Sequence, residues 1–181
     1  MDKSSNPSSK KIALTGIFTA LAAASLFLEN IFPTGKLGFY VLAGFILSVV
    51  IMECGLFFGW ISYGAVSVLS LLVVPEKTAV VPYFLFFDIY SLVKSHIEKL
   101  NRRIPEWVLK FLFFNISLYF MWNIAGLLGL VPQGLIDTLS IYGVILVLQA
   151  VFFVFDWIFT LWIQYYLKKI SPKIHATDSG L

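Results

Sequence analysis

Charged residues and cysteine are both scarce in this chain of 181 residues. Only 13% of the residues are charged, whereas 59% are hydrophobic and 17% are aromatic, and the mean hydropathy of +0.88 lies far outside the range of soluble proteins. The one cysteine, Cys54, cannot form an internal disulfide and is expected to be a small buried residue beside a turn, which argues against a redox role. The composition predicts an integral membrane protein.

The sequence also lacks the motifs of common enzymes and nucleotide-binding proteins. It has no glycine-rich phosphate loop, no His-Glu-x-x-His helix, no Gly-x-Ser-x-Gly elbow and no paired acidic metal motif. It has no internal repeat, and its formal charge of +3 is not gathered into the basic stripe that nucleic acid requires. We expect no catalytic residue, metal, cofactor or nucleic-acid partner, so any ATP-driven step would belong to another subunit.

The basic residues that are present are grouped. Eleven of the thirteen Lys and Arg residues fall into three clusters, at residues 3–11, 94–110 and 168–173. Basic residues beside membrane spans stay on the cytoplasmic side, so the three clusters should share that side and contact anionic lipid there. Each apolar stretch between clusters must then cross the bilayer an even number of times. This pattern predicts six transmembrane helices with both termini cytoplasmic, and only Lys36 and Lys77 outside.

Turn signals divide the apolar sequence into six stretches near the length that crosses a membrane, which is about 20 residues. Glu53-Cys54-Gly55 is the one plausible turn in the long run from Leu37 to Val74, and Pro132-Gln133-Gly134 supplies a later outer turn. Residues 1–10 are expected to be disordered, and residues 94–106 to form an amphipathic cytoplasmic connection. The chain is thus predicted to be a single all-α membrane domain, 1–181, with these spans: 12–32, 37–52, 55–74, 79–93, 107–131 and 139–167.

The first span carries small residues at four-residue intervals: Gly16, Ala20 and Ala24. Such a stripe lets another helix approach closely. It could pack against a helix of the same chain. It could also face a separate partner, if the neighbouring face with Ile17, Leu21 and Leu28 packs inward. We take the stripe as the candidate partner-docking surface.

Polar side chains inside apolar spans are costly, so they mark either function or internal hydrogen-bonded structure. The candidates for an outer ligand pocket come from the last three spans and two outer loops: Lys36, Lys77, Tyr83, Asp88, Tyr119, Trp122, Asn123, Tyr142 and Gln149. Lys36 or Lys77 could close over an anionic or zwitterionic ligand.

Alternative roles for these polar residues stay open. Asp88 and Gln149 could form hydrogen-bonded clamps between helices, and the tyrosines and Trp122 could belong to an interfacial aromatic belt. Glu53, Lys94 and Asp156 lie nearer the cytoplasmic end of their spans, where they could neutralise one another as structural or gating groups.

The basic start, the segment Lys11-Ile-Ala-Leu-Thr-Gly-Ile-Phe-Thr-Ala-Leu-Ala-Ala-Ala24 and six helices in about 180 residues resemble the substrate-binding S components of energy-coupling-factor transporters. In that family an Ala-x-x-x-Ala element on the first helix docks a transmembrane coupling subunit, and Ala20 and Ala24 match it. The resemblance implies a vitamin or similar micronutrient bound at the outer side, two ATPase subunits on the coupling subunit, and a prokaryotic plasma membrane.

Other functions are compatible with the same residues. The chain could be a non-transporting membrane scaffold or assembly protein, whose polar residues are structural. A stand-alone secondary transporter is a further alternative, although such carriers commonly contain an inverted repeat. A small intramembrane enzyme using Glu53 or Asp156 is disfavoured, because neither a nucleophile nor a metal set accompanies these acids.

Overall fold

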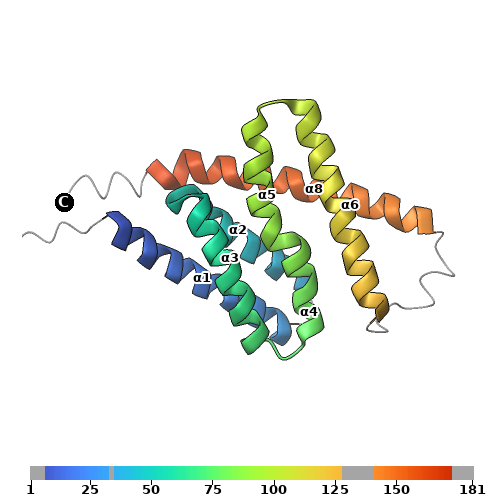
Figure 1. Ribbon diagram of the computed structural model, residues 1–181, viewed down its shortest axis with the longest axis horizontal. Coiled ribbons are helices and arrows are strands. Elements are labelled where there is room, and N and C mark those ends of the chain that lie inside the picture. The colour runs from blue at the N-terminus through green and yellow to red at the C-terminus, as the bar shows by residue number, and fades with distance from the viewer. Residues whose placement is uncertain (1–6, 33–34, 128–140, 173–181) are drawn as a thin grey trace, which may run out of the picture. The chain divides into compact units, whose positions relative to one another are not determined.

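The computed structural model describes residues 7–32, 35–127 and 141–172, and every element in these ranges is helical (Figure 1). The all-α prediction is therefore confirmed for the described residues. Within these ranges five helices are long and apolar enough to cross a membrane, at Ser9–Ile31, Lys36–Cys54, Leu56–Val73, Arg103–Leu127 and Gly143–Ile170. This is consistent with a multi-pass membrane protein.

The first three helices follow the predicted spans closely. They are α1 (Pro7–Ile31), α2 (Lys36–Cys54) and α3 (Leu56–Val73). The predicted turn at Glu53-Cys54-Gly55 is present, because Gly55 has a φ of 97°, a conformation that favours glycine and ends α2. Helix α1 starts at Pro7, inside the stretch predicted to be disordered.

The fourth predicted span, residues 79–93, is one continuous helical segment whose winding changes within it. It consists of α4 (Lys77–Pro82), the π-helical turn η1 (Tyr83–Asp88) and α5 (Ile89–Ile97). Pro82 has no backbone N–H, and its ring would collide with the carbonyl four residues earlier in a regular α-helix. The winding therefore widens immediately after Pro82.

The polar connection predicted over residues 94–106 is much shorter in the structure. After α5 a 3₁₀ turn, η2 (Glu98–Leu100), leads to Asn101 in the left-handed conformation with φ 54°, and α6 (Arg103–Leu127) follows at once. Pro105 is compatible with this early start, because the first turn of a helix needs no partner for that N–H. The predicted outer turn at residues 132–134 lies outside the described residues.

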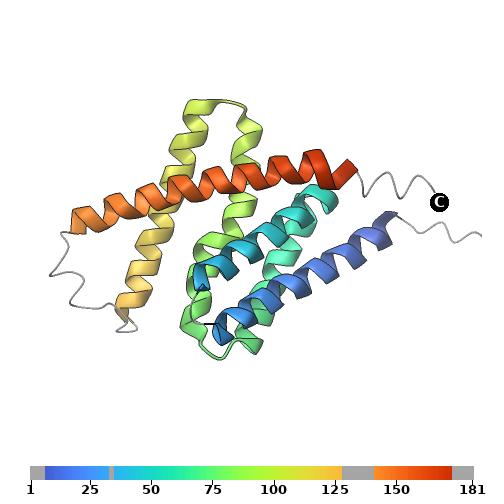
Figure 2. The same ribbon diagram turned by 180° about the vertical axis from the view of Figure 1, so that it is seen from behind.

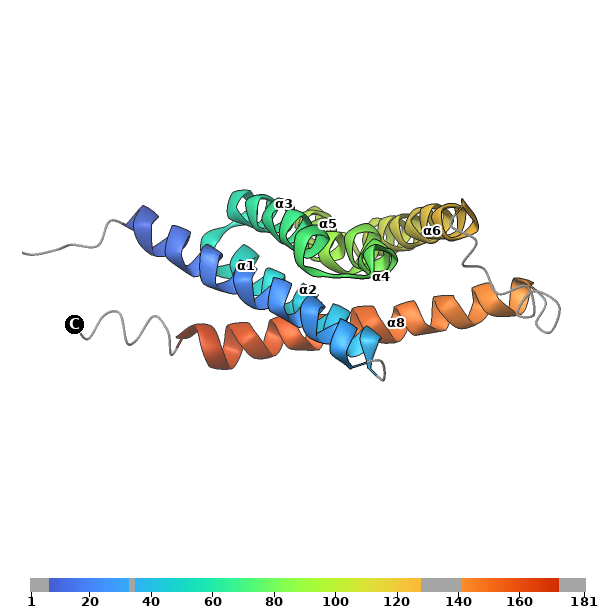
Figure 3. The same ribbon diagram turned by 90° about the horizontal axis from the view of Figure 1, so that it is seen from below.

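The helices group into two compact units, Met1–Met121 and Trp122–Leu181. The second unit contains the end of α6, then α8 (Ile141–Tyr165) and its π-helical continuation η3 (Tyr166–Ile170). In the first unit, α3, the α4–η1–α5 segment and α6 lie side by side (Figure 3). Helices α1 and α2 pack against one side of α3, and α2 also contacts η1 and α5. Phe86 of η1 contacts α6 through Phe114, with 5.3 Å between the two ring centroids.

Successive helices of the first unit run in opposite directions, as the views from both sides show (Figures 1 and 2). At one end, the Cys54 Sγ lies 3.6 Å from the Lys11 carbonyl oxygen, and the Trp60 and His96 rings are in contact. At the other end, Lys36 is 3.7 Å from Glu76. Thus Lys11 of the first basic cluster and His96, within the second, lie at one end of this bundle.

Hydroxyl-bearing residues make hydrogen bonds between these helices. The Thr19 and Ser62 hydroxyls are 2.7 Å apart and join α1 to α3, and the Ser91 hydroxyl donates to the Gly44 carbonyl at 3.0 Å, joining α5 to α2. Close approach of helices through small residues and interhelical hydrogen bonds is the usual way in which membrane helices associate.

Gly59 marks a contact where a larger residue would not fit. A Cβ atom added there would lie 2.6 Å from Ile51 Cγ1 and 3.0 Å from Leu92 Cδ2. We expect Gly59→Ala to lower stability by about 1–3 kcal/mol through overpacking. Gly64→Ala on the same helix is the control, since its Cβ would meet nothing within 4 Å and alanine favours the helix. Thermal unfolding in detergent measures both; equal melting temperatures would contradict this packing.

Candidate functional site

A buried polar centre lies where the Tyr63 side chain of α3 meets η1. Asp88 and Tyr83 come from η1, and both side chains are 0% exposed. Tyr63 and Ser67 come from α3, and the Tyr63 hydroxyl donates to the Phe84 carbonyl oxygen at 3.4 Å. Both tyrosine hydroxyls lie within electrostatic range of the Asp88 carboxylate. We call these four residues the Asp88 centre.

Several polar atoms of the Asp88 centre have no hydrogen-bond partner within the described ranges. They are both carboxylate oxygens of Asp88, the Tyr83 hydroxyl and the Ser67 hydroxyl. Tyr83 and Asp88 are neighbours within electrostatic reach of each other. Burying a polar group without a hydrogen-bond partner costs free energy, and such groups in native proteins call for an explanation, of which a binding or catalytic role is one.

The π-helical turn places these groups. Its wider winding leaves the regular i→i−4 ladder, and such turns occur frequently at functional sites. The turn contains both Tyr83 and Asp88, and the Phe84 carbonyl within it accepts the hydrogen bond from Tyr63. Thus Pro82 and the turn that follows it bring a phenol, a carboxylate and a carbonyl toward α3.

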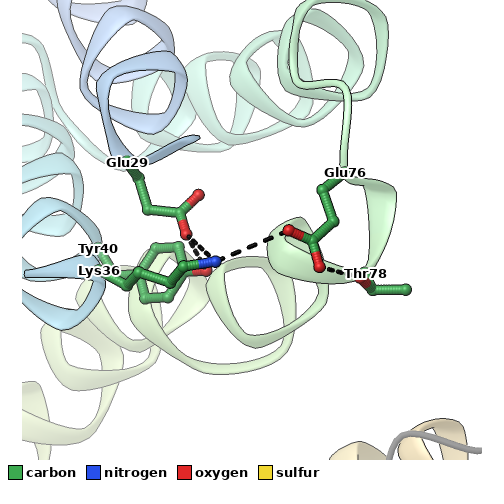
Figure 4. Close-up of polar contacts among 5 residues, drawn as sticks. All are labelled: Glu29, Lys36, Tyr40, Glu76 and Thr78. Carbon is green, nitrogen blue, oxygen red and sulfur yellow. Dashed lines mark hydrogen bonds and ion pairs between the residues drawn. The ribbon is translucent and has the colours of Figure 1, made fainter. Parts of the chain in front are cut away.

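A second polar cluster lies at the end of the bundle where α1 stops and α2 begins (Figure 4). The Lys36 ammonium lies between two carboxylates, 3.2 Å from Glu29 Oε1 and 3.7 Å from Glu76 Oε2. Glu29 is 1% exposed and also accepts a hydrogen bond from the Tyr40 hydroxyl at 3.3 Å, while Thr78 donates to Glu76 at 3.1 Å. These contacts tie together α1, α2 and the loop from α3 to α4.

Lys77, the other candidate basic residue at this end, is engaged differently. Its ammonium donates to the Leu71 carbonyl and, at 2.7 Å, to the Val74 carbonyl, so it caps the C-terminal end of α3. Both predicted ligand-closing lysines are therefore held by acceptors of the chain itself. Closure of either lysine over a ligand stays a prediction.

The remaining predicted pocket residues lie on later helices. Tyr119, Trp122 and Asn123 are exposed on α6, Gln149 is half-buried on α8, and the Tyr142 side chain lies outside the described residues. Of the predicted set, Tyr83 and Asp88 are brought together in one centre. Sequence reasoning missed Tyr63 and Ser67, although a tyrosine and a serine within an apolar span carry the same signal as the residues that were chosen.

The small-residue stripe of α1 is exposed, as predicted for a docking surface. Gly16, Ala20 and Ala24 all lie on the open side of the helix, and a Cβ added at Gly16 would meet nothing within 4 Å. The expectation that Ile17, Leu21 and Leu28 pack inward is wrong, because they are 61%, 48% and 39% exposed.

The inward side of α1 is more polar than the predicted one. It is formed by these residues: Thr15, Thr19, Ala22, Ser25, Leu26 and Glu29. Their hydroxyl and carboxylate groups are satisfied within the bundle, for example through Ser62 and Tyr40. The small stripe and the flanking aliphatic residues thus form one smooth apolar face that points away from α2 and α3.

At the opposite end of the bundle, Glu98 joins the two sides of the α5–α6 hairpin. Its Oε1 lies 2.9 Å from the ammonium of Lys94, which is 1% exposed, and 3.2 Å from that of Lys110, which is also buried. The sequence predicted an interfacial Lys94 that Glu53 or Asp156 could neutralise. In the structure Lys94 has a counter-charge, Glu98, on the next turn of its own helical segment.

Searches against known protein families, curated proteins and solved structures found no match to this chain.

Proposed function

We propose that the chain is the substrate-capture subunit of a membrane transporter, which binds a vitamin or similar micronutrient from the outer side and delivers it inward with an ATP-driven partner module. The Asp88 centre carries this proposal, because a membrane protein keeps a buried acid without partners when that acid has a functional task. A scaffold needs no such group. Substrate binding, rather than chemistry, is the task that a carboxylate flanked by phenols can perform alone.

Six membrane crossings with both termini cytoplasmic form part of the proposal. The α4–η1–α5 segment, helical from Lys77 to Ile97, would be the sixth crossing: at about 1.5 Å per residue it is roughly 30 Å long. The alternating direction of the first four crossings puts Lys11 and Lys94 at the same end, which agrees with a cytoplasmic location for both. In this orientation the Glu29–Lys36–Glu76 cluster faces outward, in a prokaryotic plasma membrane.

The partner module would dock on α1. We infer that the Gly16–Ala20–Ala24 stripe receives a helix of a transmembrane coupling subunit, to which two ATPase subunits bind. The open side of α1 supports this role, since the three small residues lie at the centre of a face flanked by exposed Ile17 and Leu21. A helix seated there would contact backbone along the stripe and aliphatic side chains at its edge.

Replacement of a stripe residue by tryptophan should break this contact. We expect Ala20→Trp or Ala24→Trp to reduce recovery of the coupling subunit and ATPases with the tagged chain about tenfold or more, because the indole would hold the partner helix away. The measurement is affinity purification from the native host in mild detergent, with quantitative mass spectrometry. Leu21→Trp is the matched control, since this edge residue is already large and exposed.

The outcomes separate the competing functions. Recovery of one membrane subunit with two ATPases, lost in Ala20→Trp and kept in Leu21→Trp, supports the transporter subunit. Equal recovery from all three proteins rejects α1 as the docking surface. If the chain is recovered alone from membranes cross-linked before extraction, the proposed function fails in favour of a stand-alone carrier or a scaffold.

A further inference from the structure

We propose that the Asp88 centre binds a primary ammonium group, so that the captured ligand is a small protonated amine. The inference rests on the proposed function only in calling the ligand a transported substrate; the recognition itself follows from the unpartnered atoms of the centre. These atoms determine which charge and which hydrogen-bonding groups a complementary ligand must carry.

The charge of the ligand follows from Asp88. Its carboxylate is fully buried, and none of the ion pairs in the described ranges includes it. The lysines that do pair lie at the two ends of the bundle, with Glu29 and Glu76 at one end and Glu98 at the other. A carboxyl group buried without a positive partner stays protonated, and it ionises when a positive charge with hydrogen-bond donors accompanies it. The complementary ligand is therefore a cation.

The hydrogen-bonding pattern favours an ammonium group. Three acceptor positions lack partners here: the two Asp88 carboxylate oxygens and the Tyr83 hydroxyl oxygen. A primary ammonium has three N–H donors and no acceptor, as in lysine, so it can satisfy all three positions. Charge-assisted hydrogen bonds of this type are about twice as strong as neutral ones.

The rings around Asp88 favour an organic cation over a divalent metal ion. Tyr63 and Tyr83 both lie near the carboxylate, and Tyr83 contacts Phe84 with 6.1 Å between ring centroids. Aromatic faces attract ammonium groups by the cation–π interaction. Divalent ions need several hard ligands, whereas no group of three or more His, Cys, Asp or Glu residues that could hold a metal occurs in the described part of the chain.

Entry to the centre requires a local opening, because Asp88 and Tyr83 are both 0% exposed. The segment that must move is η1, where the helical ladder is irregular and Pro82 supplies no N–H donor. A shift of η1 away from α3 breaks the hydrogen bond from the Tyr63 hydroxyl to the Phe84 carbonyl oxygen.

The test uses the purified full-length chain and three chloride salts at equal ionic strength. Methylammonium has three N–H donors, tetramethylammonium has the charge without donors, and sodium is the inorganic cation. We expect methylammonium alone to raise the melting temperature, in a saturable manner. Asp88→Asn should weaken its apparent affinity by about 30-fold or more, and Tyr83→Phe should weaken it less. Glu106→Gln, a carboxylate change at the start of α6, should leave the affinity unchanged.

Each other outcome overturns the proposal. Equal stabilisation by sodium would make the centre an inorganic cation site, and equal stabilisation by tetramethylammonium would reduce it to an aromatic cage. No stabilisation by methylammonium, ethylammonium or a short diamine would remove amine recognition altogether. These results do not depend on the partner purification, so amine binding can stand if docking on α1 fails, and docking can stand if amine binding fails.

Discussion

Asp88→Leu should unfold at a higher temperature than the wild-type chain, with a gain of about 1–4 kcal/mol, while losing the ability to bind an amine. Leucine has the same branching of heavy atoms as aspartate, although its two methyl groups are bulkier than the two carboxylate oxygens. The substitution removes a fully buried carboxylate whose two oxygens have no donors in the described structure. The desolvation of that carboxylate is a cost that the folded state bears and the variant does not.

This gain in stability is the reverse of what most buried substitutions give, so its sign is informative. Ser91→Ala is the matched control: its hydroxyl is also buried but donates to the Gly44 carbonyl, so the variant should lose about 1 kcal/mol. Thermal unfolding in the same detergent compares the three proteins. A destabilised Asp88→Leu would mean that the carboxylate holds the bundle together, and the Asp88 centre would then be structural.

Glu98→Gln should destabilise the first unit by about 2–4 kcal/mol. The carboxylate is the counter-charge that two buried lysines share, Lys94 at 2.9 Å and Lys110 at 3.2 Å. Glutamine keeps the size of the side chain and removes its charge, so two buried ammonium groups lose this counter-charge at once. Partial exposure of Glu98 keeps the expected cost below that of a fully enclosed pair.

The comparison variant for Glu98 is Glu106→Gln, a carboxylate within the first turn of α6 that should change stability by less than about 1 kcal/mol. Unfolding by heat, followed by the helical circular dichroism signal, measures both variants. If the two lose the same stability, the bridge across the α5–α6 hairpin contributes no more than an ordinary surface charge. A larger loss in Glu98→Gln alone confirms that the bridge holds α5 to α6.

The membrane helices could be predicted from the sequence because their signals are local. Apolar length fixes each helix, and the dipeptide Cys54-Gly55 ends α2 through a conformation that glycine adopts readily. The exposed stripe on α1 was also predictable, since a four-residue spacing puts small residues on one side of a helix. Which neighbouring side packs inward was not predictable, because apolar Ile17 is as stable against lipid as against protein.

The candidate site was harder to predict, because it is formed by contacts between segments that are distant in the sequence. Asp88 and Tyr83 could be selected because charge and phenol are costly within apolar sequence. Their meeting with Tyr63 depends on the π-helical turn after Pro82, and a proline in a helix specifies a disturbance without specifying its winding. Likewise, nothing in the spacing of Lys36, Glu29 and Glu76 required three separate segments to meet at one ammonium group.

The contacts of Lys36 and Lys77 affect how chemical labelling can determine which side of the membrane each end of the bundle faces. Amine-acylating reagents react with neutral, accessible amines, yet the Lys36 Nζ lies between two carboxylates and the Lys77 Nζ donates to two carbonyl oxygens. Membrane-impermeant acylation would therefore under-report this end of the bundle whichever compartment it faces. The single native thiol, Cys54, is buried at the opposite end and should react slowly. A cysteine introduced at the exposed position of Pro75 would therefore be labelled selectively by a membrane-impermeant thiol reagent.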